Sequence, residues 1–156
     1  MMKNLFLIIL VVFASCSKDS GSQVIVSTRV DISIKNVDGI DLLDPENDIS
    51  FKESDIEIFY LVDDEPIVCN QPSMDYSKGF VIYKHQLEYR IRVFPNDNVS
   101  DNYPITIIKW NDSINDTLKC DIERKENSTI SQKIWFNEKL VWDISNENER
   151  FFSVIK

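Results

Sequence analysis

The residue types that most often perform catalysis are sparse in this sequence. Its one histidine, His85, lies between two expected strands and is expected to be a solvated turn residue. A Ser-His-Asp site would need a serine on a glycine-flanked elbow, and there is no Gly-x-Ser-x-Gly motif. One histidine and three cysteines cannot build a histidine-based catalytic zinc site or a four-cysteine structural site. We therefore expect no enzyme, metal or cofactor, with a glycan hydrolase using paired carboxylates as the alternative.

Five acidic residues crowd one segment and could supply oxygen ligands to calcium: Asp38, Asp41, Asp44, Glu46 and Asp48. Their spacing is not that of an EF-hand, which places acids at alternate positions before a glycine. Turns in which an Asp side chain caps the backbone explain the same residues without a metal. We expect the turns, and converging carboxylates would favour calcium instead.

The first fifteen residues have the pattern of a secretion signal. Lys3 precedes nine consecutive apolar residues, Leu5 to Phe13, and two small residues follow. Such a run is too short to cross about 30 Å of hydrocarbon as a helix, but it suits the apolar region of a signal peptide. We expect residues 1–15 to be removed from the mature protein.

The tetrapeptide Phe13-Ala14-Ser15-Cys16 resembles the lipobox of bacterial lipoproteins, with Phe13 where Leu or Val is usual. The resemblance implies that Cys16 carries diacylglycerol and becomes the first mature residue, anchored in the membrane by acyl chains such as palmitate. Ser17-Lys18-Asp19-Ser20 looks like the short charged stretch that directs Bacteroidota lipoproteins to the outer face of the outer membrane. Residues 16–23 then form the lipidated cysteine and a flexible tether, and the protein is expected to face the cell exterior.

If Cys16 carries lipid, Cys69 and Cys120 remain as the two cysteines that one disulfide needs. Each lies among alternating apolar residues, so both are expected to point into a core. An exported compartment permits the bond. Two alternatives stay open, a disulfide between Cys69 and Cys120 or two buried free thiols.

The chain is acidic, with 26 Asp and Glu against 17 Lys and Arg and a formal net charge of −9. This excess repels the phosphates of nucleic acids, so DNA and RNA are not expected partners. The acidity favours solubility at a crowded cell surface. A minor alternative is an immunity or inhibitor protein whose charge matches a basic target.

Residues 24–156 are predicted to form an all-β domain, because apolar and polar residues alternate over short segments separated by turn residues. We expect a single immunoglobulin-like β-sandwich of about 7–9 antiparallel strands, with Arg150–Lys156 as a further edge strand. The expected strands are Arg29–Asn36, Ile56–Asp63, Pro66–Asn70, Phe80–Lys84, Leu87–Phe94, Ile105–Asn111, Thr117–Glu126, Thr129–Phe136 and Lys139–Ile144.

The turns between these strands have only three glycines available. Asn and Asp are therefore expected to occupy many of the left-handed backbone positions. The turn Gly39–Pro45 and the strand pairs around Ile108–Trp110 and Ile134–Trp142 resemble a group of small Bacteroidota outer-membrane lipoproteins. This resemblance implies a β-sandwich domain and no chemistry.

The three tryptophans are the best candidates for a contact surface, because exposed aromatic rings stack on sugars and on partner proteins. Core packing is the competing explanation for each of them. Trp110 is predicted to be buried, because it continues the inward row of Thr106 and Ile108. Trp135 is predicted to be the most exposed of the three and the ligand contact.

The register of the hairpin from Ile130 to Ile144 decides where its tryptophans point. If Asn137-Glu138 is a two-residue turn, Trp135 faces Leu140 and shares a face with Trp142. A three-residue turn ending at Lys139 would instead place Trp142 in the core and leave Trp135 outside. Both alternatives stay open from the sequence.

Two tripeptides, Asp112-Ser113-Ile114 and Asp116-Thr117-Leu118, match the Asp-Ser/Thr-aliphatic pattern that Bacteroidota use for O-glycosylation of exported proteins. Ser113 and Thr117 are the expected modification sites. Together these observations predict a lipid-anchored surface protein, a non-enzymatic binding or structural module whose partner is a glycan or another surface protein.

Overall fold

The structure is a computed structural model that describes residues 24–72, 75–98, 101 and 103–156. The predicted signal peptide (1–15), the lipidation site Cys16 and the tether (16–23) lie outside the described residues. In the part of the chain that is described, no helix is long and apolar enough to cross a bilayer.

The regular secondary structure of the described residues consists of eleven strands and one short 3₁₀ helix. All nine strands expected from the alternation are present, and the expected edge strand is β11. The three-residue strand β1 is not predicted by the alternation, because it is too short to establish a period. The elements are β1 (Ile25–Ser27), β2 (Val30–Lys35), β3 (Glu57–Val62), β4 (Glu65–Val68), β5 (Phe80–His85), β6 (Glu88–Val93), β7 (Ile105–Lys109), β8 (Asn115–Lys125), β9 (Ser128–Phe136), β10 (Lys139–Asp143), η1 (Ile144–Asn146) and β11 (Phe151–Ile155).

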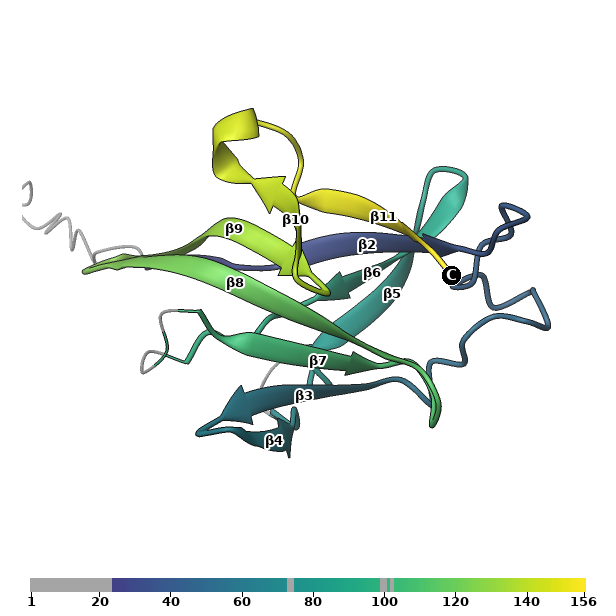
Figure 1. Ribbon diagram of the computed structural model, residues 1–156, viewed down its shortest axis with the longest axis horizontal. Helices are drawn as coiled ribbons and strands as arrows, with labels where there is room; N and C mark the ends of the chain where they lie inside the picture. Colours follow the sequence, from purple (N-terminus) through teal and green to yellow (C-terminus); the bar gives the residue numbers. More distant parts are fainter. Residues whose placement is uncertain (1–23, 73–74, 99–100, 102) are drawn as a thin grey trace, which may run out of the picture.

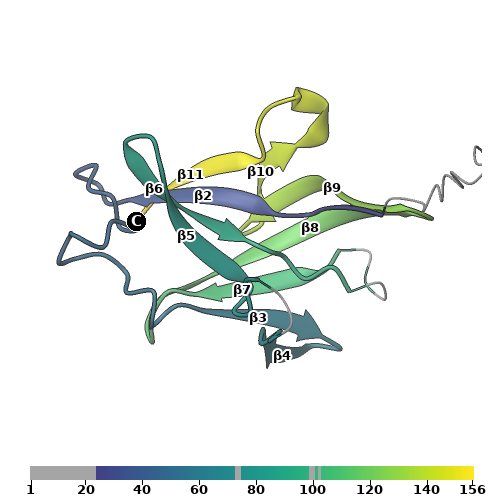
Figure 2. The ribbon, with the colours of Figure 1, turned by 180° about the vertical axis from the view of Figure 1, so that it is seen from behind.

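The strands form two sheets packed against each other, which confirms the predicted β-sandwich (Figure 1). The larger sheet has seven strands in the order β1-β9-β8-β7-β3-β4, with β10 also paired to β9. The smaller sheet has four strands in the order β11-β2-β6-β5, and Figure 2 shows β5 and β6 in front of the larger sheet.

The prediction that all strands are antiparallel is wrong for two pairs. β1 pairs with β9 in parallel, and β11 pairs with β2 in parallel. A parallel pair needs a long crossover, and these partners are separated by most of the chain. Immunoglobulin-like packing is not confirmed, because such domains divide their strands differently from this seven-plus-four arrangement.

The core lies between the sheets and is filled by the inward-facing residues of both. The predicted inward rows of β2, β3, β6 and β7 are confirmed by buried side chains: Val30, Ile32, Ile34, Ile58, Ile91, Val93 and Ile108. Leu87, expected in the same row as Ile91, is a correction. It lies in the two-residue turn between β5 and β6 and is fully exposed, because the strand begins one residue later.

Non-glycine residues occupy most of the left-handed turn positions. Asp63, Asp64 and Asn137 have positive φ, as expected for Asp and Asn, and Gln86, Glu138 and Glu147 do so as well. Among the glycines, Gly79 has a φ of 76°, and a Cβ there would stand 2.7 Å from the Sγ of Cys69. Glycine is therefore required at position 79 both by the left-handed backbone conformation and by the close contact with Cys69.

Cys69 and Cys120 are free and buried, so the structure has the second of the two alternatives left open by the sequence, two free thiols. The strand order explains the separation. The backbone N–H of Cys69 donates to Ile58 on β3, whereas Cys120 lies on β8, beyond the intervening β7. Neighbouring strands are about 4.8 Å apart, so these cysteines are at least about 10 Å apart. A disulfide spans less than about 7 Å between its Cα atoms.

Candidate functional site

The hairpin of β9 and β10 positions the predicted contact residue. Its turn has two residues, Asn137 with φ 46° and Glu138 with φ 68°, which is the left-handed pair of a type I′ turn. The Asn137 side chain fixes this turn to β8. Its Oδ1 accepts a hydrogen bond from the backbone N–H of Thr117 at 2.9 Å, and its Nδ2 donates to Oδ1 of Asp116 at 2.8 Å.

The hairpin's register combines both alternatives left open by the sequence. Trp135 pairs with Leu140, as a two-residue turn requires. A bulge then shifts the register, so that Trp142 rather than Val141 pairs with Ile134. The expectation that a two-residue turn puts Trp142 on the same face as Trp135 is therefore wrong, because the extra residue turns Trp142 into the core.

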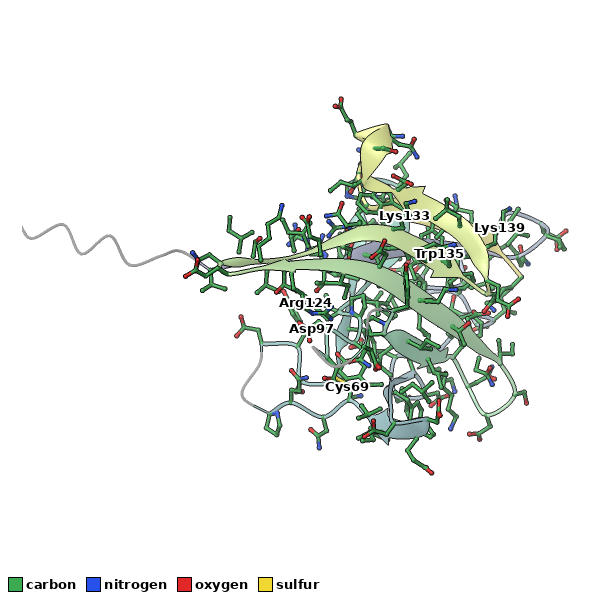
Figure 3. All side chains as sticks on the ribbon, turned by 60° about the vertical axis from the view of Figure 1, so that its left-hand side comes forward. Cys69, Asp97, Arg124, Lys133, Trp135 and Lys139 are labelled. Carbon is green, nitrogen blue, oxygen red and sulfur yellow. The ribbon has the colours of Figure 1, made fainter. Side chains whose placement is uncertain are left out.

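Trp135 is the most exposed of the three tryptophans, as predicted. Trp110 has 0% of its surface exposed and Trp142 has 7%, whereas Trp135 is only half-buried. Trp135 points away from the core because Ile134 and Phe136, its two neighbours in β9, are buried. Figure 3 shows Trp135 between Lys133 and Lys139.

A second aromatic side chain lies beside Trp135. Tyr103, 55% exposed, meets the indole edge-on, with 6.2 Å between the ring centroids. On β8 the Nζ of Lys119 lies over the indole ring, 5.0 Å from its centroid. Leu140, 47% exposed, pairs with Trp135 on the other side. The indole is thus held by neighbours while part of its surface remains open to solvent.

The apolar surface continues from Trp135 across the outer face of the seven-stranded sheet. Lys119 of β8 pairs with Trp135 on one side and with Ile105 on the other. On β3, Leu61 is the residue after Tyr60, which pairs with Thr106, so Leu61 lies opposite Ile105. These side chains face outward because the residues that alternate with them fill the core. All four residues of this outer row, Leu61, Ile105, Lys119 and Trp135, are partly exposed, and Tyr103 from the segment before β7 lies against it.

A shallow hollow of about 320 Å³ borders Tyr103, the aromatic neighbour of Trp135. Leu61, Ile105 and Tyr103 give it an apolar lining. Three carboxylates line it as well: Asp63 and Asp64 from the β3–β4 turn, and Asp101 from the segment before β7. We call the hollow together with Trp135 the aromatic site. It combines the ring of Tyr103, against which Trp135 packs, with several hydrogen-bond acceptors, and these groups can contact a small polar ligand.

Tyr103 and Asp101 are the members of this site that sequence reasoning missed. They lie in an irregular segment with no periodicity. Arg124 of β8 holds this segment, because its guanidinium donates to the carbonyl oxygens of Asn98 at 2.8 Å, Asp97 at 3.1 Å and Asp101 at 3.4 Å. Figure 3 shows Arg124 next to Asp97. No sequence pattern predicts hydrogen bonds from one side chain to several backbone carbonyl oxygens.

The acidic segment near Asp41 forms capped turns, as expected. Asp41 accepts hydrogen bonds from the backbone N–H groups of Leu43 at 2.9 Å and Tyr89 at 2.6 Å, and Asp44 accepts one from Glu46 at 3.0 Å. Within the described ranges, no group of three or more His, Cys, Asp or Glu residues is arranged to hold a metal ion. The carboxylates of Asp41 and Asp44 therefore fix the backbone of this segment.

His85 is the last residue of β5, partly buried, with its ring edge-on to Tyr83 at 6.4 Å. The expectation that it is a solvated turn residue is therefore wrong, because the turn begins at the next residue, Gln86. The described contacts of His85 give it no nucleophile and no carboxylate partner.

The two predicted glycosylation sites have different surroundings. Ser113 is exposed in the turn between β7 and β8. Thr117 lies within β8, half-buried, and the acid before it, Asp116, is buried. Asp116 accepts hydrogen bonds from the indole of Trp110 at 2.5 Å and from Lys156 at 2.7 Å. Ser113 is therefore the more accessible of the two hydroxyl groups.

Comparison of the chain with protein-family models, with curated proteins and with solved structures finds no match. The class of the protein therefore rests on its fold and on the aromatic site alone.

Proposed function

We propose that the protein is a lipid-anchored binding module of the bacterial outer membrane that faces the cell exterior and takes a carbohydrate ring at the aromatic site. The observation that carries this proposal is the open pair of Trp135 and Tyr103 beside a hollow edged by carboxylates. The anchoring rests on the signal-like residues 1–15 and on Cys16, and the role is binding rather than catalysis.

The composition of the aromatic site favours a sugar over a purely apolar ligand. The apolar face of a sugar ring packs on an aromatic face, while its hydroxyl groups donate hydrogen bonds to carboxylates. Asp63, Asp64 and Asp101 supply such acceptors, and no basic residue lines the hollow. A neutral sugar therefore fits this hollow better than an acidic one.

The size of the site limits the ligand. Pockets for small molecules usually enclose about 300–1,000 Å³, and this hollow of about 320 Å³ is at the lower end. It has room for one or two sugar rings. Lys119 can leave the indole face for the ligand, because an exposed cation–π contact contributes only about 0.5–1 kcal/mol.

A glycan array followed by calorimetric titration of the hits tests the proposal. We expect Trp135→Ala to weaken binding by about tenfold, which corresponds to about 1.4 kcal/mol of lost stacking. Trp135→Phe should retain part of the affinity, since it keeps an aromatic ring. The matched control is Tyr76→Ala, an exposed tyrosine that stacks on Phe94 and does not line the hollow.

Three results would contradict parts of this proposal. Failure of every glycan to bind at millimolar concentration would overturn the sugar as ligand. Release of shorter saccharides during incubation with a bound glycan would replace the binding module with the alternative, a lipid-anchored hydrolase. Equal loss of affinity in Trp135→Ala and Tyr76→Ala would place the binding elsewhere on the protein.

A further inference from the structure

A second hollow lies where β1 passes into β2 and where the segment after η1 enters β11. It has a volume of about 260 Å³, and its lining includes three arginines, Arg29, Arg92 and Arg150. Only two carboxylates, Asp31 and Glu149, line it with them. This excess of positive charge stands out in a chain with a formal net charge of −9. We call the hollow the arginine pocket.

The carboxylates of the arginine pocket are already engaged. Asp31 accepts two hydrogen bonds from Arg92, at 2.8 and 2.9 Å, and a third from the hydroxyl of Tyr83 at 2.7 Å. Glu149 forms an ion pair with Arg90 at 3.2 Å. Neither carboxylate has a hydrogen bond to Arg29 or Arg150 within the described residues, and Asp31 acts on these two arginines only through its charge.

Neighbouring groups hold the side chain of Arg150, and at least one of its N–H donors has no hydrogen-bond partner within the described residues. One of its Nη atoms donates to the carbonyl oxygen of Arg29 at 3.0 Å, and its guanidinium lies over the ring of Trp142, 4.7 Å from the centroid. Its Nε is buried and has no hydrogen-bond partner within the described residues. A buried donor of this kind is rarely left unpaired in a folded protein.

Electrostatics around Arg150 point the same way as the geometry. Burial lowers the pKa of Arg150 from its ordinary value and the positive charge of nearby Arg29 also lowers it, while Cys120 and the carboxylate of Asp31 act in the opposite direction. The side chain of Arg29 is exposed and forms no hydrogen bond or ion pair within the described ranges. The two guanidinium groups therefore repel each other, and an anion between them would relieve this repulsion.

From this arrangement we infer that the arginine pocket binds a phosphate group. The donors come from three separate segments, at Arg29, at Arg92 on β6 and at Arg150. Donors converging from several directions suit a tetrahedral oxyanion, because phosphate oxygens point in several directions whereas the two oxygens of a carboxylate lie in one plane. This site is independent of the sugar ligand proposed above, because the two hollows share no residue.

The phosphate has two natural sources, a free phosphate compound and a lipid headgroup. Ser27, which lines the pocket, follows the predicted lipidation site Cys16 by eleven residues. A chain of that length spans at most about 40 Å, so membrane phosphates are within reach of an anchored protein. The shared chemistry is the phosphate group, and the experiment separates the two sources.

The test follows the arginine Nε–Hε signals in NMR spectra of the full chain, held in maltoside micelles that contain no phosphate. Addition of inorganic phosphate should shift the signals of Arg29 and Arg150 in a saturable way. The signal of Arg124 is the internal control, because its Nε is also buried and unpartnered but lies outside the pocket. Acetate at equal ionic strength should bind more weakly than phosphate.

Variants and lipids complete the test. Arg29→Gln should weaken phosphate binding by about tenfold, as expected for one lost charge-assisted contact. The control is Lys52→Gln, which removes one exposed positive charge from the loop beyond the other end of β2. In the second arm, phosphatidylglycerol is added to the micelles in place of inorganic phosphate, and the same shifts would identify the headgroup as a source.

Three outcomes would overturn the inference. The first is the absence of saturable shifts at Arg29 and Arg150 with either phosphate source. The second is an equal effect of Arg29→Gln and Lys52→Gln on affinity, and the third is acetate binding as tightly as phosphate.

Discussion

The turn that positions Trp135 is predicted to become more stable when Glu138 is replaced by glycine. Glu138 has a φ of 68°, a left-handed conformation that costs a non-glycine residue about 1–2 kcal/mol. Its side chain is exposed and forms no hydrogen bond or ion pair within the described residues, so its removal breaks no contact. Glycine loses about 0.5–1 kcal/mol more conformational entropy on folding, which offsets part of the relief. The expected net gain is about 0.5–1 kcal/mol.

Thermal unfolding of Glu138→Gly measures this gain. A stabilisation of about 1 kcal/mol raises Tm by about 2–4 °C in a domain of this size. Glu138→Ala is the matched control, because it removes the carboxylate but keeps the Cβ that makes the left-handed backbone unfavourable. Its Tm should stay close to that of the unaltered protein. A Tm for Glu138→Gly at or below that of Glu138→Ala would refute the assignment of strain to this turn.

The remaining predictions concern stability, thiols, lipid and glycan. Burial alone would raise the pKa of Asp31, but hydrogen bonds from its paired arginine and a tyrosine hold it below its ordinary value of 3.8. Asp31 should therefore stabilise the fold above that pH, and this contribution should be lost as the pH falls through 3.8 and lower. Acid unfolding of Asp31→Asn, compared with that of the unaltered protein, measures this loss. Alkylation of the denatured, unreduced mature protein should modify two thiols, those of Cys69 and Cys120. Cys16→Ser should release a soluble protein that takes up no radioactive palmitate. The intact mass of the native lipoprotein should exceed that of polypeptide plus lipid, and Ser113→Ala should remove the excess.

Alternation of side chains was sufficient to predict most strands of this fold. In β7, for example, Thr106 and Ile108 are buried while Ile105 and Ile107 are partly exposed. A period of two is a local property of the sequence, and one buried face enforces it. The pairing of β1 with β9 is different in kind, because a three-residue strand has no readable period and its partner is about a hundred residues away.

The aromatic site was predictable only in part, for a related reason. Trp135 belongs to a strand, so its outward direction follows from the burial of its neighbours. Tyr103 lies in an irregular segment, and it reaches Trp135 because Arg124 binds three carbonyl oxygens of that segment. A side chain that binds backbone carbonyls leaves no pattern in the residue types around its target. Hydrogen bonds from a side chain to distant carbonyl oxygens are therefore seen only in the folded structure.

The exposure of Trp135 follows from a competition between the two tryptophans of the hairpin. An indole buries about 150–250 Å² of surface, which stabilises the fold by about 4–6 kcal/mol at 25 cal/mol per Å². The bulge in β10 costs about one ladder hydrogen bond, or about 1 kcal/mol, so turning Trp142 into the core is strongly favoured. The same adjustment cannot bury Trp135, because Ile134 and Phe136 already occupy the inner face on either side of it. Packing therefore leaves one large aromatic ring on the outer face of the sheet, where it is accessible to the carbohydrate ligand that we propose.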